Sequence, residues 1–316
     1  ILFVAAQTGF LGGPRVIANM ALDRWLPNRF AMLSDRLVTQ NGVLLMGGAA
    51  LVLMIMTEGS VQYLVVLYSI TVFITFVLAQ LGMVRHWWAA RKEGGAWKKG
   101  LGINGIGLIL TIFILASVTV LKFLEGGWLT LVVTGALVIL AVCIRRHYDH
   151  TLKLLKRLDS LVEVSRASME ALPGKVQEPV AYDPTKKTAI ILVSGFNGLG
   201  LHTLFGVVRL FGGMFKNYVF VQVGVIDAGN FKGPAELEHL KSHISGELGC
   251  YVEYMQRQGC YAEGQSAVGT DPVQSLSDLV PEILEKYPQG ICFAGQLVFP
   301  EETSFTRLLH SYVVFS

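Results

Sequence analysis

The sequence predicts an α-helical membrane portion followed by a doubly wound α/β domain, and three observations lead to this fold class. Of the 316 residues, 52% are hydrophobic and only 16% are charged, whereas soluble chains average about 25% charged residues. Residues 1–150 carry 12 Lys and Arg against 6 Asp and Glu, while residues 151–316 carry 14 against 17. The first half also has long uncharged stretches, and the second half alternates strand and helix patterns. This composition excludes a disordered, collagen-like or disulfide-stapled chain.

Three regions follow from this division. We expect a transmembrane domain over residues 1–149, a juxtamembrane helix and linker over 150–187, and an α/β domain over 188–316. At about 150 residues per domain, each of the two large regions is long enough to bury a core.

The transmembrane region holds four uncharged stretches, each long enough for the roughly 20 residues that a helix needs to cross a bilayer core. They have 21, 26, 22 and 19 residues and lie between Arg36 and Glu58, Glu58 and Arg85, Lys99 and Lys122, and Glu125 and Arg145. A membrane barrel would need alternating polar and apolar positions, which the run from Val43 lacks. We therefore expect four full spans. Residues 1–14 are also uncharged but too short to span alone, so we interpret them as the tail of a fifth helix in a fragment of a longer chain.

Basic residues fix the expected orientation. The loops 23–36, 85–99 and 145–157 hold 3, 5 and 5 Lys and Arg, whereas the turn at Glu58 holds none and the turn at 122–125 holds one. By the positive-inside rule the basic loops are cytoplasmic. We therefore expect a multi-pass protein of the inner (plasma) membrane whose C-terminal domain is cytoplasmic. The four cysteines agree with a reducing compartment and show no metal-ligand spacing.

The connector after the last span has helical periodicity. Six apolar residues share one face, namely Leu154, Leu155, Leu158, Leu161, Val162 and Met169. Two interpretations stay open: an interfacial helix on lipid headgroups, or an ordinary helix packed on its own domain. Pro173, Gly174, Pro179 and Pro184 then indicate a linker.

Strand and helix patterns alternate after the linker. Strands are expected at 188–194, 218–226, 261–268 and 291–293, and helices at 201–211, 234–258 and 272–286. Near-continuous apolar strands separated by helices are typical of a parallel sheet covered on both faces.

One glycine-rich turn could hold an anion. The first strand ends in Ser194, Gly195, Phe196, Asn197, Gly198, Leu199 and Gly200, where backbone N–H groups at a helix N-terminus favour phosphate. Asp227 follows the second strand, where it could meet a ribose hydroxyl. The turn matches neither GxGxxG nor a P-loop, so the alternative is that its glycines only make a tight turn and Asp227 only a cap. His202, His239 and His243 are expected to be surface residues, and no catalytic constellation can be assembled, so we predict no enzyme.

The membrane spans contain hydroxyl groups but no ionisable residues, which usually mark ion paths. Tyr68, Thr71 and Thr75 fall on one helical face. They either act as packing contacts between helices or line a path for a cation or polar solute.

Four segments carry a family resemblance, namely Gly13–Phe30, Asp35–Gly42, Leu67–Trp87 and Lys122–Trp128. In order, they resemble the later transmembrane segments of permeases of the amino acid–polyamine–organocation (APC) superfamily. The resemblance is closest to the KimA-like branch of bacterial potassium importers, many of whose relatives are labelled only as amino acid permeases.

The resemblance implies a LeuT-like fold of inverted repeats, of which this chain supplies approximately helices eight to twelve. It places Tyr68 at the helix-ten tyrosine of the cation site, while Thr71 and Thr75 are only its same-face neighbours. The C-terminal half resembles a universal-stress-protein-like domain, which implies regulation by an adenine nucleotide such as ATP, AMP or cyclic di-AMP. The stress-protein signature GxxGx9G followed by Ser or Thr is not found near Phe293–Val298.

These expectations amount to a secondary active transporter that imports potassium or amino acids with protons. We expect it to sit in the lipid bilayer as a homodimer, to need no cofactor or metal, and to bind no nucleic acid. Two alternatives stay open: a channel-like conductor, and a membrane-anchored sensor or nucleotide-binding regulator without transport by this chain alone.

Overall fold

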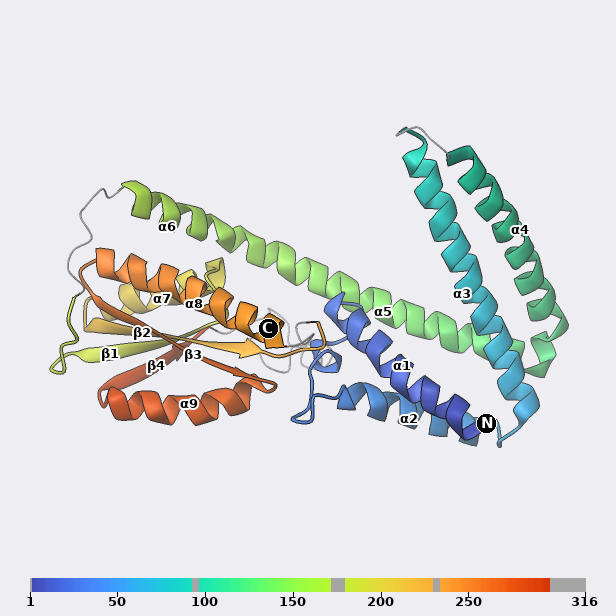
Figure 1. Cartoon of the computed structure of the whole chain (residues 1–316), viewed down its shortest axis with the longest axis horizontal. Coiled ribbons are helices and arrows are strands. Elements are labelled where there is room, and N and C mark those ends of the chain that lie inside the picture. The colour runs from blue at the N-terminus through green and yellow to red at the C-terminus, as the bar shows by residue number, and fades with distance from the viewer. Residues whose placement is uncertain (1, 93–96, 172–179, 230–233, 296–316) are drawn as a thin grey trace. The chain divides into compact units, whose positions relative to one another are not determined.

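The computed structural model describes residues 2–92, 97–171, 180–229 and 234–295 (Figure 1). The chain divides into two compact units, one of residues 47–142 and one of residues 1–46 together with 143–316.

The unit of residues 47–142 is built around two long membrane helices, α3 (Val61–Ala89) and α4 (Trp97–Leu121), which lie side by side in Figure 1. Small residues permit the contact, because Gly107 of α4 faces the Gln80 side chain and Gly100 faces Trp87. A π-type turn, Phe123–Gly127, then leads into α5 (Trp128–Leu155). Gly126 adopts a φ of +109° in this turn and lies against the Tyr63 ring, so a side chain there would meet both strain and a clash.

Three helices in the described part of the chain are long and apolar enough to cross a membrane. The remaining expected span, over residues 37–57, is shorter in the structure than predicted. Helix α2 covers Gln40–Met56, which is 17 residues or about 25 Å at 1.5 Å per residue. It starts late because Leu37 has a φ of 58°, and it ends early because Glu58 and Gly59 have positive φ. These left-handed residues stop a helix that composition alone would extend.

The first helix is longer than expected. α1 covers Leu2–Leu22 and passes through Pro14, although proline removes one internal hydrogen bond. Residues 2–14 of the uncharged stretch are therefore part of a helix that continues for two further turns.

The structure distinguishes between the two interpretations of the connector, an interfacial helix and a helix packed on its own domain. α5 continues through a 3₁₀ turn, Lys156–Asp159, into α6 (Ser160–Ala171). Leu161 and Val162 pack against the core of the α/β domain, so this helix packs on its own domain. Pro173, Gly174 and Pro179 of the expected linker lie outside the described residues.

The α/β domain has the predicted alternation of strands and helices. Its elements are β1 (Lys187–Val193), α7 (Gly198–Phe211), β2 (Phe215–Val225), α8 (Pro234–Arg257), β3 (Tyr261–Gly269), α9 (Pro272–Lys286) and β4 (Gly290–Ala294). All strand pairs are parallel, in the order β3-β2-β1-β4. The carboxyl ends of the strands therefore share one edge of the sheet.

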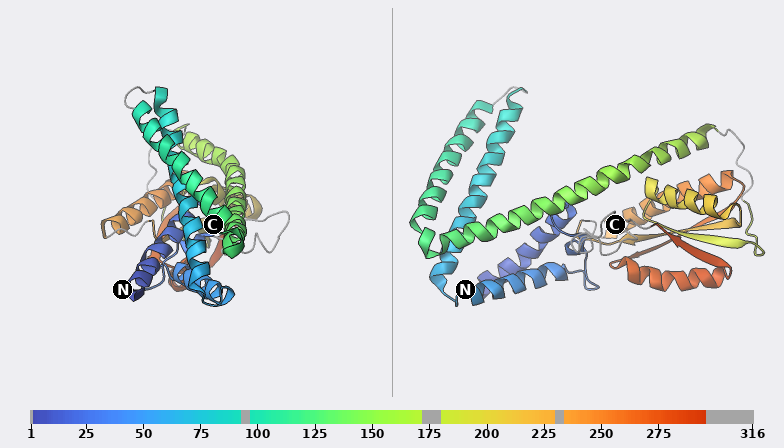
Figure 2. Two further views of the ribbon diagram at one scale, coloured as in Figure 1. Left: turned by 90° about the vertical axis from the view of Figure 1, so that its right-hand side faces the viewer. Right: turned by 180° about the vertical axis from the view of Figure 1, so that it is seen from behind.

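Both faces of this sheet are covered. α7 and α8 lie on one face and α9 on the other (Figures 1 and 2). Ile191 and Phe220 face the α7 and α8 core, whereas Ile190 and Val219 face α9. Because neighbouring residues of a strand point to opposite faces, two covered faces require the continuous apolar runs seen in β1 and β2.

Candidate functional site

The expected substrate-path residues lie on one exposed face of α3. Tyr68 is 71% exposed, while Ile70 of the same helix is fully buried. Thr71 and Thr75 are exposed, and each donates its hydroxyl to a carbonyl one turn earlier, of Leu67 at 2.8 Å and of Thr71 at 3.0 Å. Within this unit, none of the three side chains is needed to hold α3 against α4. The helix thus presents one phenol and two threonine oxygens whose lone pairs can still accept a hydrogen bond or contact a cation.

The glycine-rich turn between β1 and α7 is held rigidly. Asn197 caps α7, since its Oδ1 accepts from the Gly200 N–H at 2.9 Å. The buried Tyr251 hydroxyl donates to the Gly195 carbonyl at 2.9 Å, and burial raises the pKa of this phenol, which keeps it protonated as a donor. Gly195 has a φ of +140°, a conformation that favours glycine.

Packing accounts for all three glycines of this turn. A Cβ at Gly198 would collide with the main chain of Leu158 in the connector, and one at Gly200 would collide with the Tyr251 hydroxyl. A Cβ at Gly195 would lie 2.9 Å from a Glu247 carboxylate oxygen. For Gly198 and Gly200, these contacts favour a packing role over a phosphate site, because the glycines let neighbouring segments approach closely.

Ser194 and Asp227 nevertheless line one cavity of about 340 Å³ at the carboxyl edge of the sheet. Gln222, His243 and Glu247 line it too. The Gln222 side-chain amide donates to a Glu247 carboxylate oxygen at 2.8 Å, and His243 Nδ1 lies 3.4 Å from the same oxygen. Gln222 is only 5% exposed, and its buried Oε1 has no hydrogen-bond partner among the described residues.

Neither Gln222 nor Glu247 was predicted as a site residue. A signal existed for Gln222, because it is the only amide in an otherwise apolar strand run, Tyr218–Val225. Buried polar groups normally have partners, so a free carbonyl oxygen beside a cavity indicates a place for a hydrogen-bond donor. Glu247 gives no such signal, since it resembles the other charged positions of α8.

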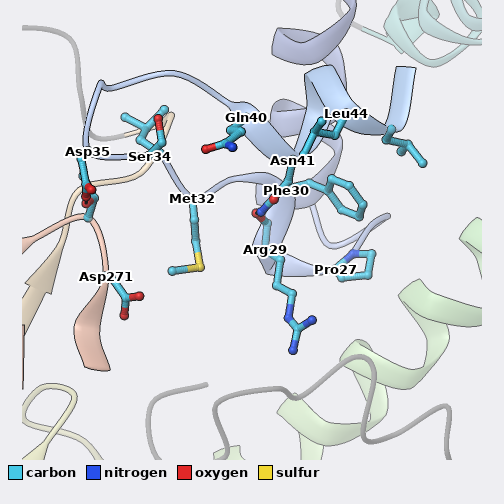
Figure 3. Close-up of a pocket in the computed structure, with 13 residues that line it drawn as sticks. Pro27, Arg29, Phe30, Met32, Ser34, Asp35, Gln40, Asn41, Leu44 and Asp271 are labelled. Atoms are coloured by element: carbon cyan, nitrogen blue, oxygen red, sulfur yellow. Dashed lines mark hydrogen bonds between the residues drawn. The ribbon is translucent and has the colours of Figure 1, made fainter. Parts of the chain in front are cut away.

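A second cavity, of about 800 Å³, lies where the loop between α1 and α2 meets the turn between β3 and α9 (Figure 3). The loop contributes Arg29, Met32 and Asp35. Asp271 caps α9 by accepting from the Val273 N–H at 2.8 Å. This cavity was not predicted, because its two sides are far apart along the chain.

The first part of the chain is similar to a known protein family. Residues 1–144 match the amino acid permease family. This part of the chain contains α3, α4 and the first part of the third helix that is long and apolar enough to cross a membrane. This part of the chain is therefore similar to permeases, as its motifs predicted, and its apolar helices support an integral membrane protein.

One curated relative supports the resemblance to the KimA-like branch. Over 198 residues the chain is 31% identical to the potassium transporter KimA of Bacillus subtilis (strain 168). The match covers 61% of this chain and 32% of KimA, so the chain spans about a third of the length of this relative. Since the match is longer than 144 residues, it extends beyond the permease segment. Both matches are to transporters, in agreement with the prediction that the chain is not an enzyme.

Proposed function

We propose that this chain is part of a secondary active transporter that imports potassium together with protons, and that its α/β domain lies in the cytoplasm and regulates transport. The observation that carries the proposal is the match to a potassium transporter that continues past the permease segment. Amino acid import is the second candidate, because the matching family is that of amino acid permeases.

The proposed mechanism is alternating access in a LeuT-like fold, with α3, α4 and α5 belonging to the less mobile wall around the substrate path. The stretches 59–84, 100–121 and 126–144 of these spans contain no Asp, Glu, Lys, Arg or His. Their contribution to a cation site is then neutral oxygen, which the exposed Tyr68, Thr71 and Thr75 supply. We further propose that the transporter works as a homodimer.

For regulation we propose an adenine nucleotide at the carboxyl edge of the sheet. Ribose hydroxyls and an exocyclic amino group are donors, which suit the Asp227 and Glu247 carboxylates and the free Gln222 Oε1. The phosphates are then oriented away from these carboxylates, towards Ser194 and Asn197 at the start of α7.

Transport is tested with the full-length protein in proteoliposomes. Potassium uptake should saturate with concentration and rise when an inward proton gradient is imposed. Saturable uptake of an amino acid in place of potassium would favour the second candidate. Ohmic, non-saturating single-channel currents would contradict the carrier proposal. Absence of flux for all of these solutes would favour a sensor.

Nucleotide binding is tested by calorimetric titration of the full-length protein in detergent with ATP, AMP and cyclic di-AMP. Asp227→Asn should weaken binding, while His202→Ala, on the exposed side of α7, is the matched control. If none of the three binds below about millimolar, a free energy near −4 kcal/mol, the α/β domain is better regarded as a dimerisation module.

A further inference from the structure

The segment that follows β2 pairs with the loop that follows α1. Met32 and Asp227 form an antiparallel bridge, and the Ala228 N–H donates to the Ala31 carbonyl at 2.9 Å. Main-chain pairing of this kind fixes both position and direction, because each donor must face one acceptor. The loop 23–39 is thus joined to the carboxyl edge of the sheet by an isolated antiparallel bridge.

The neighbouring strand holds the same loop. The Thr270 hydroxyl, just after β3, lies 3.4 Å from an Asp35 carboxylate oxygen. The Ile226 N–H donates to the Gly269 carbonyl at 2.8 Å, which ties the exits of β2 and β3 together. Two adjacent strand ends therefore contact two points of the loop.

Apolar burial strengthens this contact. Ala31 is 5% exposed, Leu33 is 9% exposed, and Gly229 lies against the Leu22 side chain. On the opposite side, the Trp25 ring stacks under the Arg145 guanidinium, 4.2 Å from the ring centroid. The loop therefore packs between the sheet edge and the cytoplasmic end of α5.

Two non-glycine residues of the loop have left-handed backbone conformations, Arg24 with a φ of 64° and Leu37 with a φ of 58°. Such residues cost on the order of 1 kcal/mol each and persist where surrounding contacts hold them. Both lie close to membrane helices, after α1 and before α2. Arg24 lies two residues after the end of α1 and Leu37 three residues before the start of α2, so the loop connects the sheet contact directly to both helix ends.

We propose that the carboxyl edge of the sheet is the docking surface for the permease loop 23–39, and that the docked loop restrains transport. This inference rests on the proposed function and adds the route of regulation. Asp227 is the link, because its side chain lines the 340 Å³ cavity while its main chain pairs with the loop. A ligand in that cavity contacts the same two-residue segment that holds Met32.

The test is a reversible lock, Ala31→Cys with Ala228→Cys, in the full-length protein. Paired residues of antiparallel strands have Cα atoms about 5.5 Å apart, within the range of a disulfide. Oxidation should form a bond within one chain, detected by mass spectrometry of the linked peptides. It should lower potassium uptake at least about fivefold, and reduction should restore it. The two single-cysteine variants should not respond, which controls for pairing with the native cysteines.

A second variant acts in the opposite direction without new chemistry. Thr270→Val removes the hydroxyl that faces Asp35 and keeps the side-chain shape, so uptake should rise above that of the unmodified protein. Ser275→Ala, which removes a hydroxyl that donates to the main-chain carbonyl of the α9 cap Asp271, is the matched control and should not change uptake.

The possible outcomes test loop docking, restraint of transport and transport itself separately. Absence of the bond, or a bond between two chains, overturns docking of the loop on its own domain. A complete bond with unchanged uptake overturns the restraint. If the unmodified protein moves no solute, the proposed function fails, and the cross-link alone then decides whether the loop docks.

Discussion

At the scale of single residues, Tyr68 gives the most direct test of a substrate path. Its side chain is 71% exposed and supports no packing within its unit, so Tyr68→Phe should leave expression unchanged. Loss of one hydrogen bond or cation contact should weaken apparent potassium affinity by about 3- to 10-fold. The measurement is concentration-dependent uptake in proteoliposomes.

Tyr63→Phe is the matched control for Tyr68. Its ring packs against Gly126, and phenylalanine keeps that contact, so affinity should stay unchanged. Equal affinity in both variants, or poor folding of Tyr68→Phe alone, would support a packing role for Tyr68 instead.

A substitution at Gly198 distinguishes a packing role from a role in phosphate binding. Its position against the Leu158 main chain means that Gly198→Val should destabilise the docking of the connector on α7 by about 1–3 kcal/mol, through overpacking. Gly206→Ala, in the same helix with open space around it, should be neutral or stabilise slightly. Hydrogen exchange of the connector and α7 peptides measures both. If Gly198→Val left the connector intact but abolished nucleotide binding, the result would support a role for Gly198 in phosphate binding instead.

At the scale of elements, β3 and α9 are joined by a network around Glu263. Its carboxylate accepts from the Tyr261 and Tyr287 hydroxyls and from Lys286 at 2.7 Å. Burial alone would raise the pKa of Glu263, but these three donors together lower it from 4.5 to about 2. A lowered pKa means that the folded state prefers the ionised carboxylate.

This network predicts a pH-dependent stability. The Glu263 contribution is fully present above pH 4.5, the pKa without the fold, and is lost as pH falls towards 2. Glu263→Gln should therefore destabilise β3 and α9 by about 1–2 kcal/mol at pH 7, after allowance for solvent screening, and the difference should shrink between pH 4.5 and 3. Hydrogen exchange of β3 and α9 peptides at several pH values measures this.

Glu253→Gln is the control for Glu263. It removes a surface pair with Arg257 whose side chains are 55% and 36% exposed, and such pairs contribute about 0–1 kcal/mol. A Glu263 effect that stays constant from pH 7 to 3 would contradict the charge argument.

How much the sequence predicts differs between elements for physical reasons. α9 is found at its predicted bounds because Asp271 and Pro272 are local start signals. α7 begins three residues earlier than expected, since the cap is Asn197 rather than a residue beside Leu201. α2 is short because of left-handed residues at its flanks, which side-chain hydropathy does not report.

The candidate sites show the same difference between features with a local sequence signal and features made by the backbone. Ser194 and Asp227 were predictable as a pair because parallel strands end at one edge of a sheet. The bridge between Met32 and Asp227 was not, because it is formed by main-chain atoms of residues far apart in sequence. A contact made by the backbone leaves no pattern of residue types.

At the scale of the whole molecule, the basic loops predict which parts share the cytoplasm. Arg91 follows α3, in a loop with five basic residues, whereas Glu58 lies in a turn with no Lys or Arg. Both side chains can be replaced without disturbing a core, since both are exposed. The prediction is that Arg91 and the α/β domain lie on the cytoplasmic side and Glu58 on the opposite side.

Cysteine labelling of the full-length protein tests this topology in intact cells, after the four native cysteines are replaced. A membrane-impermeant maleimide should label Glu58→Cys from outside, and it should label Arg91→Cys and His202→Cys only after the membrane is opened. Labelling of His202→Cys alone from outside would separate the α/β domain from the basic loops, and loop 23–39 could then not dock on the sheet. Labelling of Arg91→Cys and His202→Cys together from outside would invert the molecule and contradict the positive-inside argument, while leaving the docked loop intact.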